Sequence, residues 1–249
     1  MKDKYALLPT FRLRSACIDH VIKTWKPGHF IEFGSGTGLL TKLFLSKGYS
    51  GVCYDISQEN IAIIQSNLSS YKNVSFNTDL NNLEKESFDY IFAFDVLEHI
   101  ENDSESLEVW SSLLKPGGRA LFSVPAHMSK FGMKDEIMGH YRRYERNEIY
   151  NLLKNNRFKD IEIVCYGFPL LNITGKVIDI LFRLTKSLKK YKNLSCEERS
   201  IESGVKTPDI SKKLVFLFGD TLIALFSFIQ KFFFTKDIGA AYVVYGTKE

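Results

Sequence analysis

The sharpest chemical signal in this 249-residue sequence is the run Glu32-Phe33-Gly34-Ser35-Gly36-Thr37-Gly38. Glycines let a backbone turn tightly and approach a ligand without a clash from a Cβ atom. The spacing is E-x-G-x-G-x-G, because Leu39 stands where the dinucleotide fingerprint G-x-G-x-x-G requires its third glycine. The loop has no basic residue and begins with an acid. This disfavours a pyrophosphate ligand and suits one that carries an ammonium or sulfonium group and hydroxyls.

A second group of chemically capable side chains lies in the run from Asp135 to Tyr144, with the sequence DEIMGHYRRY. Its two Arg, two Tyr and one His can bind a carboxylate, a phosphate or a phenolate. The same residues can instead form a structural ion network that holds the following helix. The sequence leaves both interpretations open.

The elements that must position these residues alternate between strands and helices, which indicates βαβ units and a parallel sheet covered on both faces. Predicted strands are His29–Phe33, Gly51–Asp55, Val74–Asn77, Phe88–Phe94, Arg119–Val124, Ile161–Tyr166 and Ala241–Gly246. Predicted helices are residues 9–25, 39–47, 57–68 (Ser57 as N-cap), 104–114, 146–155 and 170–188. Lys115–Gly118 is predicted to be a turn, and residues 126–145 a loop region with short helices.

Composition is that of a globular protein, with 45% hydrophobic and 25% charged residues. The four cysteines are far apart and form no C-x-x-C pair, which argues against a zinc site or a disulfide scaffold and fits a reducing compartment. The first thirty residues lack a signal-peptide pattern, so we expect a cytoplasmic protein. Residues 130–249 carry most of the positive charge, which indicates either an anionic partner or a solvated surface.

The last third departs from the alternating pattern. An amphipathic helix at 170–188 ends in a basic run, residues 189–211 read as a mobile loop, and residues 214–234 are strongly apolar. Asp220 interrupts this apolar segment, and burying an Asp in a membrane costs about 2.5–3.5 kcal/mol. The closing strand must also return to the sheet, so we reject a transmembrane helix. Core packing, a homodimer interface, and a peripheral membrane or lipid-acceptor surface remain as interpretations of 170–234.

From Phe30 to about Pro125 the sequence resembles the class I S-adenosylmethionine (SAM)-dependent methyltransferases, in their type 11/23-like small-molecule subgroup. Five segments carry the resemblance, in the family's order. They are Glu32–Gly38, Tyr54-Asp55-Ile56, Asp79-Leu80, Phe94-Asp95-Val96-Leu97-Glu98-His99 and Leu113–Gly118. The stretch from Asp135 to Tyr144 resembles a D-x-x-x-G-H-x-R-R-Y stretch of one subgroup, where it lies over the acceptor pocket.

The resemblance implies SAM as cofactor, with Asp55 accepting hydrogen bonds from both ribose hydroxyls and Asp79 binding the adenine amino group. It also implies that Arg14 pairs with the methionine carboxylate. The full cofactor-binding set it implies is Glu32, Gly34, Ser35, Gly36, Gly38, Asp55, Ile56, Asp79, Leu80, Phe94, Asp95 and Arg14. Structural alternatives stay open: Asp55 as a helix N-terminal charge, Asp79 as a surface turn residue, and Glu32 as an indirect cap of the loop amides.

Methyl transfer from a sulfonium is an in-line displacement, and a base is needed only when the acceptor must lose a proton. His99, His140 and Asp135 are the catalytic candidates, although His99 can equally be a core histidine. Tyr141, Arg142, Arg143 and Tyr144 are the acceptor-binding candidates. No metal ion is expected. The segment after Phe94 lacks the motifs of the nucleobase methyltransferases, and no aromatic-laced basic stretch suggests a nucleic-acid partner.

We therefore expect an α/β fold, a doubly wound, Rossmann-like, seven-stranded sheet, mostly parallel with an antiparallel last strand, plus extra C-terminal helices. We expect one domain over 1–249, with an N-terminal helix or lid (1–28), a SAM-binding core (29–125) and an acceptor-side half (126–249) carrying inserted apolar helices (about 168–234). The predicted function is methyl transfer to a small-molecule or lipid-linked acceptor, with oxygen favoured over nitrogen as the methylated atom. A non-catalytic SAM-fold binding module and a nucleotide-dependent oxidoreductase are the alternatives.

Overall fold

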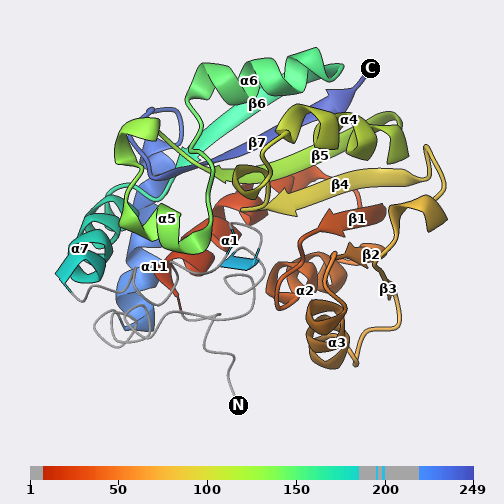
Figure 1. Cartoon of the computed structure of the whole chain (residues 1–249), viewed down its shortest axis with the longest axis horizontal. Helices are drawn as coiled ribbons and strands as arrows, with labels where there is room; N and C mark the ends of the chain where they lie inside the picture. The colour runs from red at the N-terminus through yellow and green to blue at the C-terminus, as the bar shows by residue number, and fades with distance from the viewer. Residues whose placement is uncertain (1–7, 185–194, 196–197, 200–218) are drawn as a thin grey trace. The chain divides into compact units, whose positions relative to one another are not determined.

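The computed structural model describes residues 8–184, 195, 198–199 and 219–249. It contains a seven-stranded sheet with the order β3-β2-β1-β4-β5-β7-β6. The strands are β1 (His29–Phe33), β2 (Ser50–Tyr54), β3 (Val74–Asn77), β4 (Phe88–Phe94), β5 (Leu114–Pro125), β6 (Phe158–Tyr166) and β7 (Ala241–Lys248). Strands β3, β2, β1, β4 and β5 are parallel neighbours, and β7 runs against them (Figure 1). The predicted fold class is confirmed.

The described residues divide into two compact units. Unit 1 takes its residues from Met1–Thr24, Pro125–Arg146 and Val164–Val243, and unit 2 from Trp25–Val124, Asn147–Ile163 and Val244–Glu249. The prediction of one domain over 1–249, with its three parts, stays a prediction.

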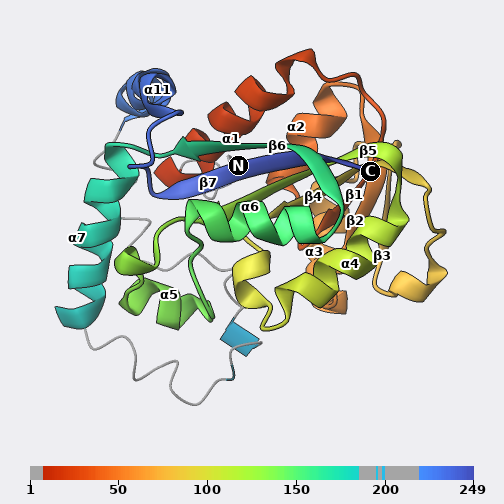
Figure 2. The same cartoon turned by 90° about the horizontal axis from the view of Figure 1, so that it is seen from above.

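Unit 2 holds β1 to β4 and most of β5, with helices on both faces of the sheet. These helices are α2 (Leu39–Ser46), α3 (Gln58–Asn67), α4 (Asp103–Leu113) and α6 (Arg146–Asn155), and Figure 2 shows α2 on one face and α4 and α6 on the other. Short 3-10 turns, η3 (Leu80–Asn82) and η4 (Leu97–His99), follow β3 and β4.

Alternating side chains of the strands explain this double cover, because neighbouring residues point to opposite faces of a sheet. On one face, Phe44 of α2 stacks on Phe92 of β4, with ring centroids 4.1 Å apart. On the other, Trp110 of α4 stacks on Phe33 of β1 at 4.2 Å. Helices α2 and α4 therefore pack on opposite faces of the central strands.

The predicted turn at Lys115–Gly118 is wrong, because these residues belong to β5. Phe88 pairs with Leu114 and Tyr90 with Arg119, so the register shifts and extra residues of β5 bulge out of the ladder. Gly117 lies in the bulge with φ +74°, which a glycine adopts without strain. The Pro-Gly-Gly signal marks this bulge and not the end of an element.

Unit 1 contains α1 (Pro9–Val21), α5 (Met133–Met138), α7 (Leu170–Leu184) and α11 (Asp220–Ile229), with 3-10 turns η2 (Ile22–Thr24), η5 (Met128–Lys130) and η6 (Gln230–Phe233). The predicted loop with short helices at 126–145 is confirmed by η5 and α5. Gln230 is a buried polar link, because its amide donates to the Leu13 carbonyl and its Oε1 accepts from the Gly167 N–H, both at 3.0 Å.

Helix α7 has two apolar faces. Leu170, Leu171, Ile178 and Phe182 are buried in unit 1, whereas Ile173, Val177, Ile180 and Leu184 are exposed. On α11 and η6, Ile223 is buried, and Leu225, Phe228 and Phe232 are exposed. Core packing thus accounts for one face of α7. Within the described residues, no helix combines the length and apolar character that crossing a membrane requires. The predicted helical residues 185–188, the loop 189–211 and residues 214–218 lie outside the described structure, apart from Ser195, Glu198 and Arg199.

Candidate active site

The turn between β1 and α2 requires glycine at three positions. Gly34, Gly36 and Gly38 have φ values of +62°, +54° and +76°. These lie in the left-handed region, which residues other than glycine rarely adopt. A Cβ on Gly34 would also lie 2.7 Å from Cγ2 of Val96. The Gly34 N–H donates to the Tyr54 carbonyl at 2.9 Å, and Ser35 Oγ donates to the Glu32 carbonyl at 3.2 Å. The loop is therefore a fixed, side-chain-free turn at the carboxyl end of β1.

Glu32, the acid that begins the loop motif, is buried beneath it. Its Oε2 accepts a hydrogen bond from the Thr41 hydroxyl of α2 at 2.5 Å. Cys53 donates to the same Thr41 oxygen, with sulfur and oxygen 3.8 Å apart. The carboxylate thus ties β1 to the first turns of α2.

Asp55 stands directly after β2 and is 7% exposed. Its Oδ1 accepts from the Ser57 N–H at 2.9 Å and from the Asn60 side-chain amide at 3.1 Å. Burial raises the pKa of this carboxyl, and the two hydrogen bonds offset only part of that rise. Within the described structure, Oδ2 has no hydrogen-bond partner. The neighbouring Ile56 is 59% exposed, so an acceptor oxygen and an apolar surface lie side by side.

Asp79 follows β3 as the N-cap of η3, and it is exposed. Its Oδ1 accepts from the backbone and side-chain amides of Asn81, and Oδ2 accepts from the Asn82 side chain. Leu80 begins the turn beside it and is half-buried. The carboxylate is held in place by its own turn, as the surface-turn alternative predicts, and its lone pairs can still accept from a ligand.

The end of β4 carries a strained residue. Asp95 has φ +56°, is exposed, and accepts from the Ser123 hydroxyl at 2.8 Å. Phe94 before it is buried. Backbone strain of this kind occurs often at functional sites. In η4, Glu98 is fully buried and His99 is half-buried.

The second candidate group centres on Asp135, which is 1% exposed in unit 1. Its Oδ1 lies 2.8 Å from His140 Nδ1 and accepts from Arg143 Nε at 3.0 Å. Its Oδ2 lies 2.9 Å from Arg143 Nη2 and accepts from the Gly132 N–H at 2.9 Å. The hydrogen bond from His140 and the Arg143 charge outweigh burial and hold the pKa of Asp135 far below its usual range. A carboxylate so strongly ionised is a weak base and a firm anchor.

The four acceptor-binding candidates differ in exposure. Arg143 is committed to Asp135, with a further contact to the Ala126 carbonyl at 3.4 Å. Tyr144 is buried, and its backbone bridges to Ala126. Tyr141 is exposed and Arg142 half-buried, so these two are the more accessible of the four. Arg14 is half-buried on α1.

Three residues that support this site were not singled out from the sequence. Thr41 holds Glu32, Asn60 holds Asp55, and Ser123 holds Asp95. Asn60 had a readable signal, because it sits in the first turn of the helix that follows Asp55. Thr41 and Ser123 had none, since their roles depend on which faces of separate elements meet.

These features agree with the family comparison. Residues 12–163 match the model of a methyltransferase domain family, which is more than half of the chain. The chain belongs to this methyltransferase family. The family is SAM-dependent, as the sequence predicts.

Curated relatives match a smaller part of the chain. A ubiquinone biosynthesis O-methyltransferase of Coxiella burnetii is 28% identical over 105 residues, covering 41% of this chain and 45% of the relative. A malonyl-[acyl-carrier protein] O-methyltransferase of Halalkalibacterium halodurans is 29% identical over 107 residues, covering 40% of each chain. The match thus spans less than half of each of these relatives.

Solved structures show the same fold over most of the chain. A SAM-dependent methyltransferase from Archaeoglobus fulgidus has a TM-score of 0.56 at 15% identity, covering 95% of this chain and 93% of that one. A phosphoethanolamine N-methyltransferase from Haemonchus contortus, solved with phosphomonomethylethanolamine and S-adenosylhomocysteine, has a TM-score of 0.58 at 19% identity. It covers 94% of this chain and 52% of that one.

Proposed function

We propose that this methyltransferase transfers the methyl group of SAM to an oxygen atom of a small-molecule or lipid-linked acceptor. The observation that carries the cofactor part is the buried Asp55 carboxylate, whose Oδ2 has no partner among the described residues. The low exposure of this carboxylate, together with an oxygen that no described residue contacts, suits a ligand that donates to it. The ribose hydroxyls of SAM are the donors we propose.

Bound SAM supplies an activated methyl group together with its leaving group. The protein's residues therefore mainly hold and align the two reactants and exclude water from them. The glycines of the β1–α2 turn let the backbone approach the amino-acid part of the cofactor. Exposed Ile56 offers an apolar contact to the adenine, and Asp79 an acceptor for its amino group. Arg14 is the proposed partner of the methionine carboxylate.

A hydroxyl acceptor must lose a proton, and we propose His140 as the base that takes it. Asp135 Oδ1 lies 2.8 Å from Nδ1 of His140, a contact that orients the ring and favours the tautomer with its proton on Nδ1. Asp135 is then a positioning residue, because its carboxylate is engaged by His140, Arg143 and Gly132. His99 is the second candidate base. Tyr141 and Arg142 are the proposed acceptor contacts, with Arg143 and Tyr144 supporting them.

Two observations favour an acceptor with an apolar chain. The curated relatives above are O-methyltransferases named for ubiquinone biosynthesis and for malonyl-[acyl-carrier protein]. In this chain, α7 and α11 expose large apolar side chains, Ile180 and Leu184 on the one and Leu225 and Phe228 on the other. A lipid-linked acceptor fits such a surface. Peripheral membrane contact and a homodimer through the same residues remain proposals, as does a cytoplasmic location. Flotation with anionic vesicles and sedimentation test the first two.

The test measures S-adenosylhomocysteine formed by the purified full chain with SAM and each of three acceptors. These are a phenol with a prenyl chain, the same phenol without it, and a malonyl carrier protein. We expect turnover, fastest with the prenylated phenol. His140→Ala should lower kcat by about 10²–10⁴-fold without weakening SAM binding. The control is His20→Ala, an exposed histidine near the end of α1.

The outcomes separate the alternatives. Binding of S-adenosylhomocysteine without turnover on any acceptor would favour a non-catalytic binding module. Failure to bind it, together with binding of NAD, would refute the proposal and favour the oxidoreductase.

A further inference from the structure

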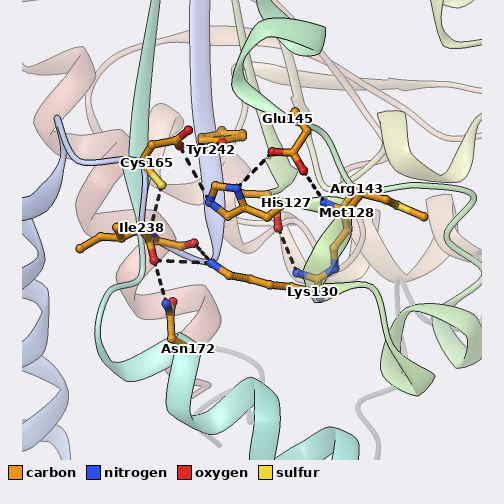
Figure 3. Close-up of polar contacts among 12 residues, drawn as sticks. His127, Met128, Lys130, Arg143, Glu145, Cys165, Asn172, Ile238 and Tyr242 are labelled. Atoms are coloured by element: carbon orange, nitrogen blue, oxygen red, sulfur yellow. Dashed lines mark hydrogen bonds and ion pairs between the residues drawn. The ribbon is translucent and has the colours of Figure 1, made fainter.

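Three side chains of types that can bind a metal ion come from separate segments of unit 1 and lie close together. His127 follows β5, Cys165 lies near the end of β6, and Asp237 precedes β7. One ligand atom from each, a ring nitrogen, the sulfur and a carboxylate oxygen, all lie within 4.8 Å of one another. Figure 3 shows His127 and Cys165 facing one another across this point.

The imidazole of His127 is held so that one nitrogen is left for a ligand. Nδ1 lies 3.3 Å from Glu145 Oε2, and the other oxygen of Glu145 accepts from the Met128 N–H at 2.9 Å. Nε2 is buried and has no hydrogen-bond partner in the part of the chain that the structure describes. Its nearest carboxylate oxygen, Asp237 Oδ1, is 3.8 Å away, too far for a hydrogen bond. The backbone of His127 is also strained, with φ +65°.

The sulfur of Cys165 is buried, and its surroundings include a polar backbone group. The Gly239 N–H donates to it at 3.1 Å, and a Cβ on Gly239 would lie only 2.8 Å from the sulfur. Burial raises the pKa of this thiol to about 11. Lys130 stands nearby, and its Nζ donates to the carbonyl of Gly239 at 2.5 Å. The chain thus provides a backbone donor that stabilises a thiolate where burial alone opposes one.

We propose that His127 Nε2, Cys165 Sγ and a carboxylate oxygen of Asp237 bind one divalent cation of the zinc class. Imidazole, thiolate and carboxylate are the zinc ligands found in proteins, and three of them leave the fourth tetrahedral position to water. Zinc ligands lie about 3.2–3.8 Å from one another in such a site. His127 Nε2 and Asp237 Oδ1 are already 3.8 Å apart, and the remaining separations, which are within 4.8 Å, must shorten by at most about 1 Å. The Asp237 side chain is 44% exposed and has room for that movement.

The surrounding contacts have the form of a second coordination shell. Glu145 Oε2 contacts Nδ1 of His127, the ring nitrogen that would not bind the cation. This contact fixes the tautomer and orients the ring. Tyr242 donates its hydroxyl to Asp237 Oδ1 at 2.7 Å, and the Gly239 N–H supports the sulfur. A cation here would keep one position open to water and would also hold three segments of unit 1 together. It would join the start of the 126–145 segment to the end of β6 and to the loop before β7, where the Ala126 N–H already donates to the Ala240 carbonyl.

A competing interpretation needs no metal, with a protonated His127 between Glu145 and Asp237 as an ion-pair network. The two interpretations differ in the number of cations bound per chain, in the protons released on metal addition, and in the absorption spectrum with Co²⁺. Metal binding must remove the proton from the Cys165 thiol, whereas an ion-pair network binds no cation.

The test titrates the chelator-treated full chain with Co²⁺ and with Zn²⁺. We expect one Co²⁺ per chain with thiolate-to-cobalt charge-transfer absorption, and about one proton released per Zn²⁺ near neutral pH. Cys165→Ala should abolish the charge-transfer band, and Asp237→Asn should weaken Zn²⁺ binding at least about tenfold. The matched control is Cys53→Ala, a buried cysteine of unit 2, which should keep the band.

No Co²⁺ band in the wild-type chain would overturn the proposal, and so would Zn²⁺ affinity unchanged in both ligand variants. If Cys165→Ala does not fold, Asp237→Asn decides alone, because its half-exposed side chain can change without loss of the core. None of these readouts involves methyl transfer, so the outcome is independent of the proposed enzyme activity.

Discussion

Replacing Asp55 with Ala should weaken S-adenosylhomocysteine binding by about two orders of magnitude. The proposed ribose contacts are hydrogen bonds to a charged acceptor, each worth about 1.5–3 kcal/mol. Loss of two such bonds gives about 3 kcal/mol at the low end, which is roughly 150-fold in Kd. Asp55→Asn keeps the shape of the side chain and one acceptor oxygen, so its loss should be smaller, about tenfold. Isothermal titration calorimetry on the full chain measures both.

The same carboxylate also supports the fold, so a second variant must separate the two roles. Asn60→Ala removes the side-chain amide that donates to Asp55 Oδ1 and leaves Oδ2 in place. It should lower the free energy of unfolding by about 1–2 kcal/mol and change Kd by less than about tenfold. An Asp55→Ala protein that folds and binds S-adenosylhomocysteine within about threefold of wild type would refute the assignment. So would an Asn60→Ala protein that loses as much affinity as Asp55→Ala.

Three further predictions concern the supporting contacts. Gly34→Ala should abolish cofactor binding, because φ at this position is +62° and the new Cβ would clash with Val96. Adding Val96→Ala should restore little binding, since the backbone strain remains. Calorimetry measures cofactor binding in both proteins. Thr41→Val should cost about 1–3 kcal/mol in urea unfolding by leaving Glu32 without this donor, whereas Thr78→Val, at an exposed hydrogen bond, should cost under about 0.5 kcal/mol. Asp135→Asn should cost about 3–5 kcal/mol near neutral pH. Since the folded-state pKa of Asp135 is lowered, its contribution is complete above the ordinary Asp value of about 4 and is lost as pH falls from there through the folded-state pKa. The difference between wild type and variant should therefore narrow steadily in urea melts taken downward from about pH 4.

The central strands could be predicted from the sequence because their signals are local. His29–Phe33, Val74–Asn77 and Phe88–Phe94 agree with the structure to the residue. Ser57 is the N-cap of α3 as predicted, and its side chain accepts from the Asn60 N–H. The error at Lys115–Gly118 has a physical reason, because a bulge and a turn use the same residues. Only pairing with the neighbouring strand distinguishes them.

Site residues within one short segment could also be predicted, whereas residues that come from separate segments could not. Gly34, Gly36 and Gly38 could be found because one short turn imposes all three backbone conformations. The cluster of His127, Cys165 and Asp237 could not, since its members come from three segments that only tertiary folding brings together. The absence of a C-x-x-C pair argues against a zinc site built on one turn, and it does not bear on ligands that three separate segments supply.

Asp55 and Asp135 show why a motif position does not by itself give a role. Both are carboxylates buried within their unit, and burial raises the pKa of each. At Asp135, the hydrogen bond from His140 and the Arg143 charge outweigh burial, and both oxygens have internal partners. At Asp55, neutral donors reach Oδ1 alone, so burial prevails and the pKa stays raised. The first carboxylate is complete without a ligand and can only position its neighbours. The second keeps one oxygen that no described residue contacts, and this difference, invisible in the sequence, makes Asp55 the stronger candidate for a ligand contact.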